Sequence, residues 1–117
     1  MTIKRMHVGP RMSEAAIFNR TVYLAGQIAE DTKQDIAGQT REVLGHIERL
    51  LAEANSDKQH LLSVQIFLTQ ISNFAAMNSV WDSWVAPGHT PARATLEAQL
   101  AVPGCLVEII VVAAQRD

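Results

Sequence analysis

Two residues in the last quarter of the chain, Arg93 and Glu108, have side chains suited to binding and reacting with a small acid. An arginine guanidinium can hold a planar carboxylate through two parallel hydrogen bonds. Glu108 interrupts the otherwise apolar segment 106–114, where a carboxylate must be paired, protonated or turned toward a polar cavity. Both residues also have an ordinary interpretation, in which Arg93 forms a surface ion pair and Glu108 is the partner of a structural arginine. Spacing alone leaves the choice open.

The segments that carry these residues are predicted to be two strands. Segment 92–100 alternates, with Arg93 and Thr95 on the polar face, and the segment of Glu108 is rich in β-branched residues. Pro and Gly at 103–104 are typical of a turn, so we expect an antiparallel hairpin. In that pairing a polar pocket would hold Arg93, Thr95 and Glu108, although a slip of one residue in the register would change which side chains face each other.

The preceding chain predicts three strands, a helix, a strand and a second helix, at 2–8, 14–18, 21–25, 35–54, 61–69 and 74–85. The order βββαβαββ predicts an α+β fold: a single, mostly antiparallel sheet with two helices on one face, in one domain spanning 1–117. The apolar stripe of the second helix comprises Phe74, Met77, Trp81 and Trp84 or Val85.

Oligomerisation is predicted from the apolar strands. Two helices can cover only one face of the sheet, yet segments 61–69 and 106–114 are largely apolar on both faces. A single copy would therefore expose a large apolar patch. A homo-oligomer that buries this patch is the simplest solution.

Composition excludes several classes of partner. The net charge is −2, with 10 Lys and Arg against 12 Asp and Glu, so no basic field is available to hold nucleic acid or an anionic membrane. No apolar run approaches the roughly 20 residues of a membrane span, and the first residues lack the apolar core of a signal peptide. The single cysteine, Cys105, cannot form an internal disulfide, so we expect a cytoplasmic protein.

The histidines and the cysteine predict no metal or nucleophile site. His7, His46, His60 and His89 have no spacing that would gather metal ligands, so no metal site is expected. His46 is expected on the exposed side of the first helix. Cys105 lies beside the predicted turn and is interpreted as an incidental small residue rather than a nucleophile.

Several segments together resemble the Rid family (RidA/YjgF, reactive-intermediate deaminases). They are AGQIAED, SVQIFLTQISNFAAMNSVWDSWV, GHTPARA and ARATLEAQLAVPGCLVEIIVVAA, and the resemblance extends from about residue 13 to 114. The P-A-R motif and the fifteen-residue step from Arg93 to Glu108 are its most specific features. WDSWVAPGHTPARA is closer to the YoaB-like branch than to RidA itself. The resemblance implies a chorismate-mutase-like fold and a homotrimer with ligand sites in the clefts between subunits.

The resemblance also implies an activity. Proteins of the RidA branch hydrolyse reactive enamines and imines, such as 2-aminoacrylate and its imine tautomer, to 2-keto acids and ammonia, without a metal or organic cofactor. By this resemblance Arg93 binds the carboxylate of a 2-imino or 2-keto acid, and Glu108 positions or activates the attacking water. Gly26 and Asn78 correspond to further substrate-binding residues of the family.

The chain departs from the family pattern at three pocket positions. The family's tyrosine in P-Y-S falls on Met12, with Ser13 following; its serine before G-Q falls on Ala25; and its cysteine two residues after the arginine falls on Thr95. We include Ser13 and Thr95 among the predicted substrate-binding residues. The departures favour an alternative, a non-catalytic small-carboxylate-binding or regulatory protein on the same trimeric scaffold. A third interpretation, an RNA- or protein-interacting protein, conflicts for RNA with the acidic net charge and the few aromatic residues.

Overall fold

The computed structural model describes residues 2–117, which fold into six strands and two α-helices with two short 3₁₀ turns. The elements are β1 Lys4–Val8, β2 Ser13–Phe18, β3 Thr21–Leu24, α1 Ile36–Glu53, η1 Lys58–His60, β4 Leu61–Leu68, η2 Ile71–Asn73, α2 Phe74–Trp84, β5 Ala92–Glu97 and β6 Val107–Ala114. The predicted order βββαβαββ is confirmed. None of the helices in these residues is long and apolar enough to cross a membrane.

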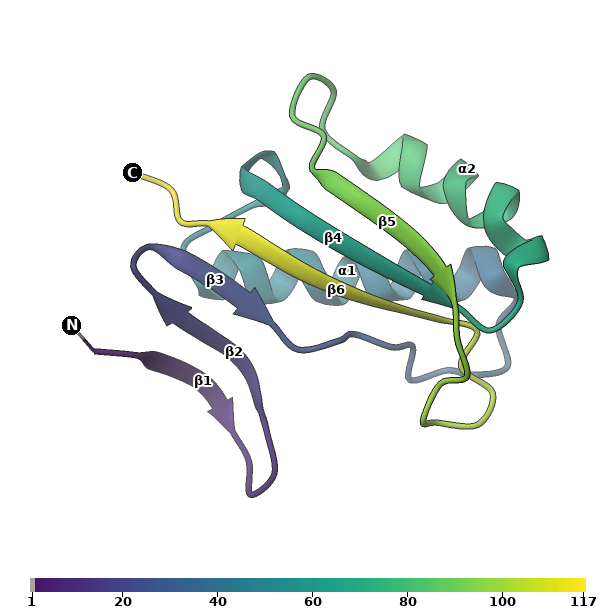
Figure 1. The fold of residues 1–117 in the computed structure, drawn as a ribbon, viewed down its shortest axis with the longest axis horizontal. Helices are drawn as coiled ribbons and strands as arrows, with labels where there is room; N and C mark the ends of the chain where they lie inside the picture. Colours follow the sequence, from purple (N-terminus) through teal and green to yellow (C-terminus); the bar gives the residue numbers. More distant parts are fainter. Residues whose placement is uncertain (1) are drawn as a thin grey trace.

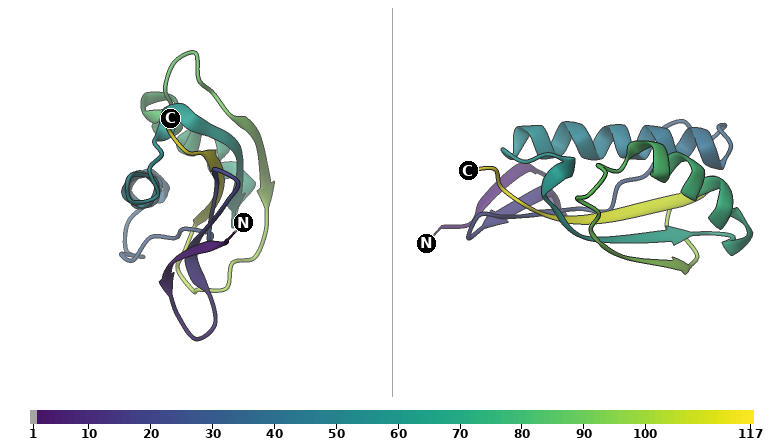
Figure 2. Two further views of the ribbon diagram at one scale, coloured as in Figure 1. Left: turned by 90° about the vertical axis from the view of Figure 1, so that its left-hand side faces the viewer. Right: turned by 90° about the horizontal axis from the view of Figure 1, so that it is seen from above.

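The six strands form one mixed sheet in the order β1-β2-β3-β6-β4-β5 (Figure 1). Every neighbouring pair is antiparallel except β4 and β5, which run parallel. Both helices lie on the same side of this sheet, as Figure 2 shows in the view from above. The predicted α+β class, with two helices on one face, is therefore confirmed.

Local sequence signals set several of the element boundaries. Asn19 and Arg20 have φ values of 53° and 59°, which match the tight two-residue turn that joins β2 to β3. The Asp35 side chain accepts a hydrogen bond from the backbone N–H of Gly38 at 2.9 Å and so caps α1. Asn55, with φ at 60°, follows α1 in the left-handed conformation that ends many helices.

The core lies between the two helices and one face of the sheet. On β6 the residues that point to this face, Val107, Ile109, Val111 and Ala113, are at most 1% exposed. The alternate residues point to the other face, which no helix covers, and are only half-buried. This open face carries apolar side chains from four strands: Tyr23, Phe67, Leu96, Ile110 and Val112.

The predicted hairpin between the last two strands is wrong. β5 pairs in parallel with β4, with Arg93 opposite Val64, and β6 lies on the far side of β4, between β4 and β3. A central position gives the most apolar strand of the chain two hydrogen-bonded neighbours, while β5, whose side chains are mostly exposed, takes the edge. The helix α2 supplies the long crossover that a parallel β4–β5 pair requires.

Candidate functional site

Arg93 lies on the helix-covered face of the edge strand β5, because its partner Val64 on β4 is buried there. Its guanidinium carbon is 5.3 Å from the centre of the Trp81 ring and 5.9 Å from that of Phe74, both on α2. Aromatic rings at this distance attract a cation. Within residues 2–117 Arg93 forms no ion pair, so the structure does not support the surface-ion-pair interpretation.

Two polar atoms beside Arg93 have no hydrogen-bond partner within the described residues: Oδ1 of Asn78 and Oγ1 of Thr95, both buried. Asn78 is four residues after Phe74 and three before Trp81 on α2, so it shares the face of the two rings. Thr95 is two residues after Arg93 and points the same way. Buried polar atoms without partners usually cost about 1–3 kcal/mol each, so these two indicate the place of a ligand or a partner group.

Glu108 is on the opposite face of the sheet. Its chain neighbours Val107 and Ile109 are fully buried under the helices, so the Glu108 side chain points to the open face. There the carboxylate lies against the backbone of Gly26, where an added Cβ would be 2.0 Å from the Glu108 atom Oε2. Gln27 and Ile109 exchange two backbone hydrogen bonds, of 2.9 and 3.1 Å, which fix this approach.

The pocket predicted to hold Arg93, Thr95 and Glu108 together is therefore absent from a single copy of residues 2–117. β4 separates β5 from β6, and the arginine and the glutamate point to opposite faces. The structure instead forms two groups. The arginine half-site consists of Arg93, Thr95, Asn78, Phe74 and Trp81. The glutamate half-site consists of Glu108 and Gly26.

The other pocket positions named from the sequence are Ser13, Met12 and Ala25. Ser13 begins β2 and pairs with Val8 of β1, next to the turn that joins the two strands. Met12 precedes it and is 52% exposed. Ala25 is half-buried and adjoins Gly26, so a methyl group occupies the position of the family's serine.

Sequence reasoning assigned Phe74 and Trp81 to the apolar stripe of a core helix and so missed their place beneath Arg93. Trp81 is buried, but Phe74 is 42% exposed. The sequence does contain a signal for these two rings beneath Arg93. A large aromatic residue begins the helix, four residues before an asparagine on the same face. Cys105 is buried, and burial raises the pKa of its thiol, which agrees with its interpretation as an incidental residue.

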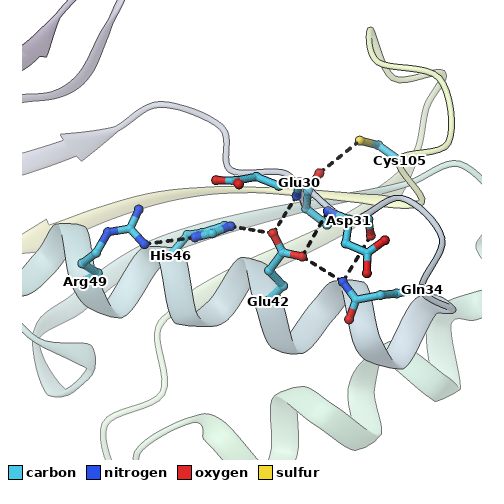
Figure 3. Close-up of polar contacts among 8 residues, drawn as sticks. Glu30, Asp31, Gln34, Glu42, His46, Arg49 and Cys105 are labelled. Carbon is cyan, nitrogen blue, oxygen red and sulfur yellow. Dashed lines mark hydrogen bonds and ion pairs between the residues drawn. The ribbon is translucent and has the colours of Figure 1, made fainter.

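Sequence reasoning also missed a polar network on α1, drawn in Figure 3. The Glu42 carboxylate accepts hydrogen bonds from the backbone N–H groups of Glu30 and Asp31 and from the side chains of Gln34 and His46. These hydrogen bonds lower the pKa of Glu42 to about 2, and the bond from the Glu30 N–H has the largest effect. His46 was expected on the exposed side of the helix, but its side chain is only 15% exposed because it turns toward Glu42.

Comparisons with known proteins agree with the motif resemblance. Residues 2–115 match the sequence profile of the family described as Endoribonuclease L-PSP. The chain is 46% identical to a RutC family protein of Haemophilus influenzae, covering 97% of this chain and 98% of the relative. It is 41% identical to the RutC family protein YoaB of Escherichia coli, covering 97% and 99%.

A solved structure shows the same likeness. The crystal structure of a YjgF family member from Neisseria meningitidis superposes with a TM-score of 0.97 at 46% identity, covering 100% of this chain and 98% of the other. Such identity over the full length shows common membership as well as a common fold. The chain belongs to the family described as Endoribonuclease L-PSP, which is the Rid/YjgF family that its motifs resemble.

Proposed function

We propose that this protein hydrolyses reactive 2-imino acids, formed from enamines such as 2-aminoacrylate, to 2-keto acids and ammonia. One observation carries the proposal. The Arg93 guanidinium rests on two aromatic rings, has no ion-pair partner within residues 2–117, and lies beside two buried oxygens without hydrogen-bond partners. A cation held in this way is ready to bind the carboxylate of a small acid.

The proposed site is completed by assembly into a homotrimer. The open face of the sheet exposes Tyr23 and Leu96, by 49% and 46%, and so provides an apolar surface for a second copy to cover. Each copy offers an arginine half-site on one face and a glutamate half-site on the other. We infer that the arginine half-site of one subunit meets the glutamate half-site of its neighbour in a cleft.

In this cleft Arg93 would hold the substrate carboxylate while Glu108 accepts a proton from a water molecule whose oxygen attacks C2. The electrons of the C=N bond move to nitrogen, which takes up the proton and gives a carbinolamine. In the second half Glu108 takes the hydroxyl proton and passes it to nitrogen. The C–N bond then breaks, the C=O bond forms, and ammonia leaves with Glu108 ionised again.

This small set of groups is sufficient for the reaction. An imine is already electrophilic and hydrolyses slowly in water, so the protein needs only to orient the acid and one water molecule. A positioned general base typically contributes a rate increase of about 10²–10⁴-fold. No step requires a metal or an organic cofactor.

A second function, a non-catalytic receptor for small carboxylates, is favoured by Met12 and Ala25. Both place apolar groups where the family's pattern has hydroxyls, and Met12 is 52% exposed. A receptor would use the arginine half-site for binding and need no base at Glu108.

The two functions are separated by measuring the release of ammonia from iminopropanoate generated enzymatically from an amino acid. The deaminase proposal expects faster release with the wild-type protein than without it, at catalytic protein concentrations. Wild-type protein that binds pyruvate in calorimetry but accelerates release from none of several amino-acid-derived imines would decide for the receptor.

A further inference from the structure

A cavity of about 420 Å³ lies between the β1–β2 hairpin, the segment that follows β3, and α1. Its volume is within the range of small-molecule sites. Neither Arg93 nor Glu108 lines it, and it shares only the Gly26 wall with the glutamate half-site. The proposed function therefore leaves this cavity without a role.

Hydrogen bonds to Glu42 hold two walls of this cavity in place, the loop at Glu30 and the face of α1 that carries His46 and Arg49. The Glu42 atom Oε2 accepts from the backbone N–H of Glu30 at 2.6 Å and from Nε2 of His46 at 2.8 Å. Nη1 of Arg49 lies 3.2 Å from Nδ1 of His46. Because a guanidinium only donates, Nδ1 must accept and the ring proton must be on Nε2. One ionised carboxylate thus fixes both the loop at Glu30 and, through His46, the guanidinium of Arg49, as Figure 3 shows.

The wall opposite α1 presents hydrogen-bond acceptors. Gln27 is 7% exposed, and its amide nitrogen donates to Oε2 of Glu14 at 2.9 Å and to the carbonyl of Ala25 at 3.0 Å. Within residues 2–117 no hydrogen bond is made to the carbonyl oxygen of that amide or to the other oxygen of Glu14. These two acceptors and the nearby Glu30 carboxylate suit an ammonium group, which has three N–H donors. Arg49, with N–H groups left over, suits a carboxylate.

One residue that lines the cavity, His7, has a strained backbone. His7 has a φ of 52° inside β1, a left-handed conformation that is rare for a side chain other than glycine in a strand. Its Nε2 lies 2.6 Å from Oε2 of Glu53 on α1, so this contact joins β1 to the helix between two residues that line the cavity. Strain of this kind is concentrated at binding and active sites.

We propose that this cavity is a second binding site, which takes a small zwitterion of the amino-acid type. The ammonium group is bound by Glu14, Gln27 and Glu30, and the carboxylate by Arg49. This inference is independent of the proposed deaminase activity, because its binding groups are not those of either half-site.

The test is a titration of ¹⁵N-labelled full-length protein with L-alanine, followed by NMR. We expect the amide signals of Glu30, His46 and Arg49 to shift in a saturable way. L-Alaninamide, which lacks the carboxylate, and propanoate, which lacks the ammonium group, should each bind more weakly. Loss of a charged hydrogen bond predicts an affinity at least about tenfold lower for Arg49→Gln and for Glu14→Gln.

Arg41→Gln is the matched control, since it removes one positive charge from the same helix outside this cavity. Arg41→Gln should bind L-alanine as the wild type does. Arg93→Ala should also bind L-alanine normally, because Arg93 does not line this cavity. Any loss of imine hydrolysis in Arg93→Ala tests the deaminase proposal and not the second site. Circular dichroism melting of each variant separates lost binding from lost folding. Three results would overturn the inference: no saturable shift at millimolar L-alanine, equal binding by folded Arg49→Gln, or equal binding of L-alaninamide.

Discussion

The arginine half-site and the glutamate half-site are built in different ways. Arg93 is on an edge strand, and its position depends on rings contributed by α2. Glu108 is on a central strand, and its carboxylate lies against the backbone of Gly26. The first group offers a cation and polar atoms without hydrogen-bond partners among residues 2–117, which suit binding. The second offers a carboxylate, which suits proton transfer. We therefore expect a division of labour in which the arginine half-site binds the acid and the glutamate half-site transfers the proton. Separate substitutions can test this expectation.

The largest effect is expected for Glu108→Gln. The substitution keeps the shape of the side chain but removes the base, so kcat for imine hydrolysis should fall by about 10²–10⁴-fold. Pyruvate binding, measured by calorimetry, should change little. If Glu108 has only a structural role, the melting temperature should fall instead, and hydrolysis per folded molecule should stay at the wild-type level.

Arg93→Ala is expected to act on binding first. Removing a two-pronged charged contact should weaken pyruvate binding by about 10²-fold or more, and hydrolysis should fall with it. Arg93→Lys should restore only part of the affinity, because an ammonium group cannot form the two parallel hydrogen bonds of a guanidinium. The fold should remain intact in circular dichroism, since Arg93 is on an edge strand and only half-buried. Unchanged calorimetric affinity in Arg93→Ala would refute the carboxylate clamp.

Mixing the two inactive variants tests whether the half-sites of different subunits meet. In a randomly mixed trimer, one site in four pairs an intact arginine from the Glu108→Gln subunit with an intact glutamate from the Arg93→Ala subunit. Co-expressed and co-purified variants should therefore regain about a quarter of the wild-type activity. A site built within one subunit would regain none. Light scattering of the same samples checks the trimer, and a stable monomer at micromolar concentration would contradict it.

The sequence predicted the elements well and the pairing of the last two strands poorly. Local signals such as the Asn19-Arg20 turn and the Asp35 cap act over a few residues and can be identified without a structure. The strand that pairs with β5 depends on which strands are most favourable at the centre of the sheet. The Pro-Gly turn at 103–104 carries no information about that order. Arg93 and Glu108 could be named from residue type and motif. Their separation onto opposite faces follows from that strand order and could not be predicted.

The smallest of these effects is expected at Gly26. A methyl group there would lie 2.0 Å from Oε2 of Glu108, too close for any real contact, so Gly26→Ala must displace the carboxylate or the segment that follows β3. Displacement of a reacting group by about 1 Å can cost up to 10²-fold in rate, and since this side chain can rotate away we expect kcat to fall between about 10- and 100-fold.

Gly45→Ala is the control for Gly26→Ala. Gly45 is on an exposed position of α1, and an added Cβ would have no atom within 4 Å. Alanine is the better helix former, so this variant should be slightly more stable and fully active. Pyruvate binding should be nearly unchanged in both variants, because neither touches the arginine half-site. If Gly26→Ala weakens pyruvate binding as strongly as it lowers kcat, then the glutamate half-site also binds the acid, and the division of labour between the two half-sites fails.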